Sequence, residues 1–132
     1  MRHLIAAMLL VAAVFHLLPL SGVLGGEHLT RLYGATFAEP NLTILMRHRA
    51  VILGLLGLFL AAAAIHPPFR AAAFVAGFAS VISFLGLAWS VGGYNGQLAR
   101  VFAADVLVLV CLIIGCLAHL YTSRRRNGVT SD

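Results

Sequence analysis

The stretch NLTILMRHRAVILGLLGLFLAAAAIH, residues 41–66, decides the fold that this sequence predicts. It is almost continuously apolar, and a helix of about 20 apolar residues is long enough to cross the hydrocarbon core of a bilayer. Arg47, His48 and Arg49 interrupt it near its start. A charge at that depth costs from about 3 to more than about 10 kcal/mol unless it is paired, hydrated or able to reach the interface. These three residues are therefore the first functional candidates.

Composition places the whole chain in the same class. Of its 132 residues, 61% are hydrophobic and 10% are charged, and the mean hydropathy is +1.00. This is far more apolar surface than a soluble domain of this size buries. The net charge of +5 comes from scattered residues and helix ends, without a basic groove interleaved with aromatic residues, so nucleic acid is not an expected partner. The sequence predicts one integral membrane domain.

We expect an all-α, integral membrane, antiparallel four-helix bundle. Pro67 and Pro68 end the second helix, and Pro19 should kink the first helix near His16, because proline lacks the backbone amide that the helix uses. The expected helices cover residues 4–24, 41–66, 69–91 and 98–121. Together they form one transmembrane domain, residues 1–123, followed by a basic cytoplasmic tail, residues 124–132.

The arginines also predict the topology. With four spans, Arg2, Arg70 and the run 124–126 lie on one side, where Asp132 is the only acid. The other side mixes basic residues with acids: Arg31, Arg47, Arg49, Arg100, Glu27, Glu39 and Asp105. Since positive residues collect on the cytoplasmic side, both termini should be cytoplasmic. We expect a multi-pass protein of the bacterial cytoplasmic (inner) membrane.

This topology brings most of the polar residues to the outer third of the bundle. A carboxylate and an arginine at equal membrane depth form an ion pair most economically, so we expect Arg47 to pair with Asp105. Glu27 is the expected partner of Arg49 or Arg31. On a helical wheel Arg47 borders the face of small residues that should pack, whereas Arg49 leans toward lipid.

Two interpretations of this polar cluster remain open. In the first, the charges are structural: the Arg47 pair fixes helix order, and Arg49 reaches lipid phosphate. In the second, the cluster lines a pocket for an anionic or amphipathic ligand, lipid-like or quinone-like, with proton relay through its histidines as a variant. The candidate ligand-binding residues are His16, Glu27, Arg47, His48, Arg49, Tyr94, Asn95 and Asp105.

The residues leave three classes of function open. The favoured one is a non-enzymatic ligand-binding membrane protein, and the alternatives are an accessory subunit of a membrane complex and a small transporter or oxidoreductase component. Small residues along the third helix, among them Gly77, Ser83 and Gly86, should discriminate between the first two. If they pack inside the monomer, a self-contained pocket is favoured; if they face lipid, a partner helix or homo-oligomer is expected.

Other chemistry has little support in the sequence. His3, His66, Cys116 and His119 should lie near the cytoplasmic end but lack the spacing of a metal site. No nucleophile motif and no glycine-rich phosphate loop is present, so we expect no catalytic residues. Membrane lipid is an expected partner. No cofactor is expected, and a bound quinone or lipid stays open as the alternative.

Several segments carry a resemblance to a known group. LYGATFAEPNLTILMRHRAVILGLLG and VGGYNGQLARVFAAD, most specifically at Tyr33-Gly34, residues 46–49 and Gly93-Tyr94-Asn95, resemble small bacterial membrane proteins of the DoxX-like type. The resemblance implies a four-helix inner-membrane fold and little about activity. Some members are labelled phosphopantetheine adenylyltransferase, but the H-x-G-H motif of such nucleotidyltransferases does not occur among the six histidines here.

Overall fold

The computed structural model describes the backbone of residues 1–128 and the side chains of residues 1–125. The Arg126 side chain and residues 129–132, which include Asp132, lie outside this part. The described chain is helical throughout apart from short connections, and it contains no strand. Its elements are α1 (Arg2–Leu17), η1 (Leu18–Leu24), α2 (Gly26–Tyr33), α3 (Pro40–Ile65), η2 (Pro67–Phe69), α4 (Arg70–Val91) and α5 (Gly96–Gly128).

Four of these segments are long and apolar enough to cross a membrane, as the sequence predicted. They cover Arg2–Leu24, Pro40–Ile65, Pro67–Val91 and Gly96–Arg125. Their large side chains are widely exposed, and Trp89 reaches 82% exposure. In a membrane protein such residues face lipid, so the exposed apolar surface agrees with a multi-pass protein.

Local sequence explains most helix ends. The first span changes from α-helix to 3₁₀-helix at Leu18, next to Pro19 and two residues after His16, near which the sequence predicts a kink. Glu39 caps α3, because its carboxylate accepts hydrogen bonds from the backbone N–H groups of Asn41 and Leu42 at 2.9 and 2.6 Å. α5 is longer than expected and continues through Gly128, so the described part of the tail is helical.

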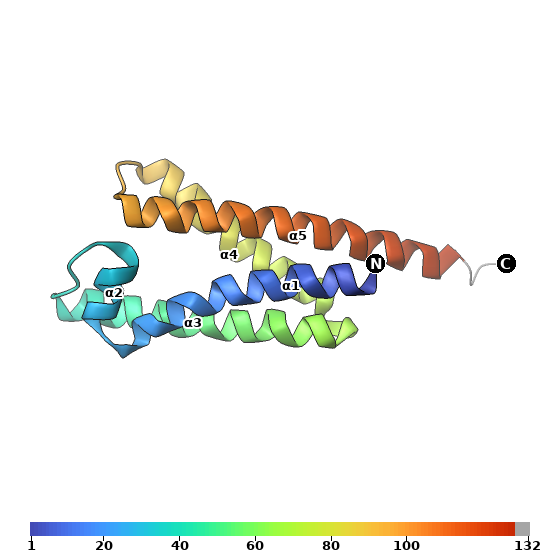
Figure 1. Ribbon diagram of the computed structural model, residues 1–132, viewed down its shortest axis with the longest axis horizontal. Coiled ribbons are helices and arrows are strands. Elements are labelled where there is room, and N and C mark those ends of the chain that lie inside the picture. Colours follow the sequence, from blue (N-terminus) through green and yellow to red (C-terminus); the bar gives the residue numbers. More distant parts are fainter. Residues whose placement is uncertain (129–132) are drawn as a thin grey trace.

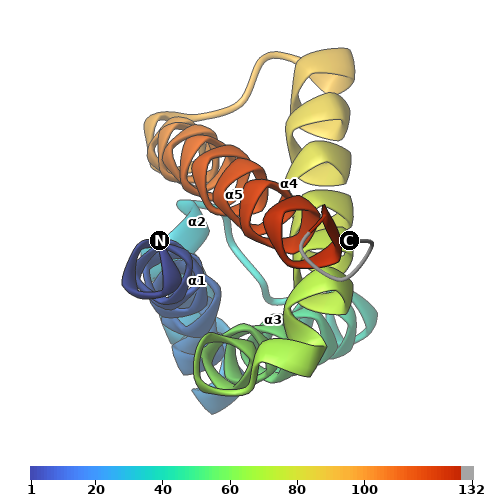
Figure 2. The ribbon, with the colours of Figure 1, turned by 90° about the vertical axis from the view of Figure 1, so that its right-hand side faces the viewer.

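The long helices alternate in direction along the long axis of the molecule, with the start of α1 and the last turns of α5 at one end (Figure 1). We call this the terminal end; α2 and the α4–α5 connection mark the opposite, loop end. α1 packs against α3 and α5, and α4 packs mainly against α5. The end of α3 and the start of α4 are joined by η2 at the terminal end, and the two helices diverge from there, because α4 is strongly inclined to α1 and α3 (Figure 2).

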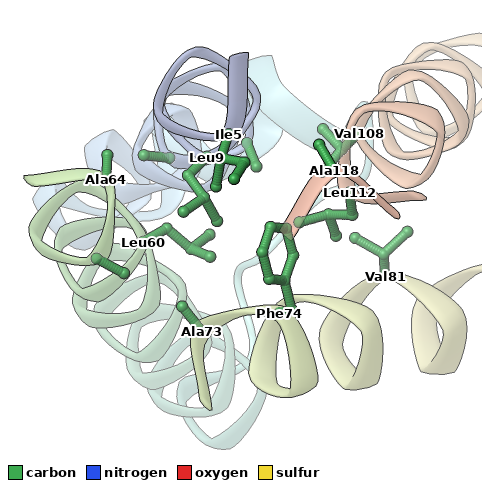
Figure 3. Close-up of a cluster of buried hydrophobic side chains, with 13 residues drawn as sticks. Ile5, Leu9, Leu60, Ala64, Ala73, Phe74, Val81, Val108, Leu112 and Ala118 are labelled. Carbon is green, nitrogen blue, oxygen red and sulfur yellow. The ribbon is translucent and has the colours of Figure 1, made fainter. Parts of the chain in front are cut away.

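Close packing between α1 and α3 uses the glycines of α3, as the small-residue face predicted. A methyl group at Gly57 would lie 2.8 Å from Leu17 Cγ and 3.0 Å from the Ala13 carbonyl oxygen. Toward the terminal end, all four long helices contribute to one core, in which Leu60, Phe74 and Leu112 are central (Figure 3). The helices are therefore tightest on this side of the molecule.

Candidate functional site

The divergence of α4 leaves a cavity of about 410 Å³ in the loop half of the molecule. The five α-helices and η1 contribute to its wall. Apolar side chains form much of the lining: Phe15, Leu18, Pro19, Leu32, Leu53, Phe84, Leu87, Val101 and Ala104. The polar lining consists of His16, Arg31, Tyr33, Arg49, Ser80, Ser83, Gln97, Arg100 and Asp105.

Arg49 projects from α3 into this cavity between two aromatic rings. Its guanidinium carbon lies 5.3 Å from the centre of the Tyr33 ring and 5.5 Å from that of Phe84. Such contacts attract a cation to the ring face but leave its charge in place. Burial raises the pKa of the Tyr33 phenol, and the Arg49 charge opposes that rise. The prediction that Arg49 leans toward lipid is wrong, because α2 folds back and brings Tyr33 over it.

Arg47 lies on the other side of α3. Its side chain is exposed, it does not line the cavity, and its Nε donates a hydrogen bond to the Val23 carbonyl at 2.9 Å. Two residues along a helix turn through about 200°, so only one of Arg47 and Arg49 can face inward. The contact made by Arg47 is thus not the expected pair with Asp105.

Asp105 lies half-buried on α5 and lines the cavity. His16 and Arg49 line the same cavity. Asp105 therefore shares its cavity with Arg49. It does not share the cavity with Arg47, the partner that the sequence predicted.

His16 is only 5% exposed. Its Nδ1 donates a hydrogen bond to the Ala12 carbonyl at 2.8 Å, and its Nε2 lies 3.3 Å from Ser80 Oγ. With the proton on Nδ1, Nε2 is an acceptor for the Ser80 hydroxyl. The histidine thus links α1 to α4 at the apex of the cavity.

The remaining predicted site residues lie around the cavity and not in its lining. Glu27 and His48 are exposed. Tyr94 stacks on Phe102 at a centroid distance of 5.9 Å. Asn95 donates from Nδ2 to the Tyr33 and Gly34 carbonyls at 2.8 and 3.2 Å, and its Oδ1 accepts from Leu98 N–H at 2.8 Å. Asn95 therefore fastens α2 to the start of α5.

The predicted set omitted several lining residues, notably Arg31, Tyr33, Arg100 and the α4 positions Ser80, Ser83 and Phe84. Ser80 and Ser83 belong to the small-residue stripe of α4, which the sequence indicated as a packing seam. Their exposure to a cavity depends on the inclination of α4, for which the local sequence carries no signal. The sequence predicts Arg31 as a partner of Glu27 and does not predict that Arg31 or Tyr33 lines a cavity.

No group of three His, Cys, Asp or Glu side chains within the described residues is arranged to hold a metal ion. Cys111 and Cys116 are both free thiols. No family model matches the chain, and comparisons with curated proteins and with solved structures likewise give no significant match. The resemblance to DoxX-like proteins therefore stays a prediction.

Proposed function

We propose that this protein binds an anionic or quinone-like amphipathic molecule in the loop-half cavity, without catalysing a reaction on it. In this proposal the chain is an antiparallel four-helix bundle of the bacterial cytoplasmic membrane, with both termini in the cytoplasm. The observation that carries the proposal is the cavity itself, which combines apolar walls with a small set of convergent polar groups.

Charge favours an anionic or electron-rich head group. Among the described residues that line the cavity, Arg31, Arg49 and Arg100 are cationic, whereas Asp105 is the only carboxylate. Arg31 and Arg100 are exposed and open to hydration, whereas Arg49 is half-buried, and a charge in such a place needs a partner. A carboxylate, phosphate or quinone oxygen on a ligand would supply the missing acceptor.

The aromatic contacts of Arg49 make it the best-placed donor. Tyr33 and Phe84 hold the guanidinium from α2 and α4 without neutralising it. A pre-positioned donor loses less conformational entropy when a ligand binds. Phe15, Leu53 and Leu87 provide the apolar surface for a ring or chain.

The proposed orientation follows from the ends of the helices. Arg2, Arg70, Arg124 and Arg125 all belong to the terminal end, where α1 and α4 begin and α5 approaches its last turns. The described residues at this end include no acid. Under the positive-inside rule this end faces the cytoplasm, so the cavity opens toward the outer leaflet.

One observation favours the alternative, an accessory subunit of a larger membrane complex. A methyl group added at Gly86 would meet no atom within 4 Å, and Trp89 and Ser90 beside it are exposed. An uncovered small-residue surface permits close approach of a helix from another chain.

Native mass spectrometry of the gently solubilised full chain tests the proposal. We expect a retained mass of a lipid or quinone in the unmodified protein and in Arg47→Gln, and its loss in Arg49→Gln. The two variants make the same charge change two positions apart on α3, so they separate cavity binding from general electrostatics. If none of the three proteins retains a lipid or quinone and all three carry a second protein, the result would support the accessory-subunit alternative instead.

A further inference from the structure

A second cavity lies at the terminal end of the molecule, far from the site proposed above. Its volume is about 560 Å³, and it forms where α1 begins, where η2 leads into α4, and where α5 approaches its last turns. The lining residues are Arg2, Pro67, Pro68, Arg70, His119, Thr122 and Ser123. None of them lines the loop-half cavity.

Arg70 is a built part of this cavity. The side chain is only 7% exposed, and it donates from Nε to the Ala63 carbonyl at 3.3 Å and from Nη2 to the Ala64 carbonyl at 3.0 Å. These carbonyls belong to the last turn of α3, whose backbone acceptors lack partners within the helix. The contacts fix the guanidinium in position, but they are made to neutral groups and leave its full charge.

The other groups add to the positive character. Arg2 lines the same cavity and adds a second guanidinium group to that of Arg70. Among the described residues of the lining, none is acidic. Thr122 already donates to backbone carbonyls, which leaves Arg2, Arg70, His119 and Ser123 as donors for an anion.

The surroundings indicate an anion that is attached to a lipid. Leu4, Phe69 and Leu120 are exposed apolar side chains on the three segments that form the cavity. The cavity lies where three candidate spans end or begin, at the depth at which head groups meet the hydrocarbon core. A phosphate held here would place acyl chains along these exposed side chains.

We propose that this second cavity binds the phosphate-bearing head group of an anionic lipid in the leaflet that contacts the terminal end. The inference does not depend on the ligand proposed for the loop-half cavity, because the two share no residue. It assigns Arg70 as the fixed phosphate contact and Arg2 as an exposed second contact, two arginines that the sequence indicated only as topology signals.

The test measures phospholipid binding to the full chain in detergent by native mass spectrometry, in an Arg49→Gln background that removes the main donor of the other cavity. Phosphatidylglycerol is compared with phosphatidylcholine. We expect phosphatidylglycerol to bind more tightly, and Arg2→Gln to weaken it about tenfold, the loss of one hydrogen bond to a charged group. Arg125→Gln, an equal charge change at the same end but outside the cavity, should weaken it less than about twofold, because solvent and salt screen an exposed charge that does not contact the lipid.

Arg2 is the informative position, because Arg70 also holds α3 and its removal could disturb the fold. Equal weakening by the Arg2 and Arg125 variants would reduce the effect to general attraction by the basic end and would overturn the site. Equal binding of the two lipids would also overturn it. Displacement of phosphatidylglycerol by millimolar inorganic phosphate would show that the site takes a soluble phosphate anion and not a lipid.

Discussion

The two halves of α4 carry the same kind of sequence and have different surroundings. In the first half, Ala73 and Gly77 are buried, and a methyl group at Gly77 would lie 3.2 Å from Leu112 of α5. In the second half, Gly86 and Ser90 continue the stripe but are exposed. A small-residue stripe thus permits close packing, but the path of the neighbouring helix decides whether packing occurs.

The same contrast explains how each half of the molecule is held together. The terminal half relies on interdigitated side chains such as Leu60, Phe74 and Leu112. The loop half contains the cavity, and polar contacts tie its connections together, including Asn95 with the end of α2 and Glu39 with the start of α3. The packed stripe of α4 and these polar contacts can therefore be tested by separate variants.

The largest expected effect comes from adding volume to the packed half. Gly77→Leu should lower the free energy of unfolding by about 1–3 kcal/mol or more, because the new side chain would overlap Leu112. Gly86→Leu, the matched control on the same helix, should change it by less than about 0.5 kcal/mol. Unfolding in mixed micelles by titration with denaturing detergent measures both. If Gly77→Leu and Gly86→Leu lowered the free energy of unfolding by similar amounts, the two halves of α4 would not differ in packing.

A smaller effect is expected at the loop end. Asn95→Ala removes the side chain that caps α5 and donates to the carbonyls of Tyr33 and Gly34, so stability should fall by about 1 kcal/mol. Asn95→Ser keeps a capping oxygen and should recover part of the loss. Hydrogen exchange of the α2 amides should rise in Asn95→Ala. Unchanged exchange there would mean that α2 is held by other contacts.

The smallest expected effect is a pH dependence of the start of α3. Two backbone N–H donors, from Asn41 and Leu42, lower the pKa of Glu39 below its ordinary value of 4.5. The stabilisation is therefore present in full above pH 4.5 and is lost as the pH falls through the lower pKa of the folded state. Unfolding curves measured from roughly pH 6 down to roughly pH 3 span the range in which carboxylates ordinarily titrate. The free energies of unfolding of the parent and of Glu39→Gln should approach each other at the low end of this range. A constant difference across that range would contradict the cap.

Sequence reasoning predicted those features that depend on local pattern. Apolar length predicted the four candidate spans, and glycine spacing predicted the close contact at Gly57. Pro19 predicted a kink near His16, and the helix changes to 3₁₀ geometry at Leu18. The helical wheel assigned Arg47 and Arg49 to the wrong sides of α3. Which of the two arginines faces inward depends on α2, which folds back and places Tyr33 against Arg49. The sequence indicated Arg70 only as a topology signal, since nothing local shows that its side chain reaches the end of α3.

The cavity depends even more on long-range geometry. Its lining includes Phe15, Arg31, Arg49, Phe84 and Asp105, which lie far apart in the sequence on different helices. Periodicity places each residue on a face of its own helix, but it does not give the inclination of one helix to another. The sequence could therefore predict that polar residues gather in one half, but not which of them share a cavity.

The most direct test of the central claim is the dissociation constant of a defined anionic amphiphile, dodecanoate, for the unmodified protein, Arg49→Gln and Arg47→Gln, with dodecanol as the neutral control. We predict that Arg49→Gln weakens dodecanoate binding about tenfold, the loss of one hydrogen bond to a charged group. Arg47→Gln should stay within about twofold, and neither variant should change dodecanol binding. Equal effects of the two arginine variants, or none, would contradict a ligand site built around Arg49.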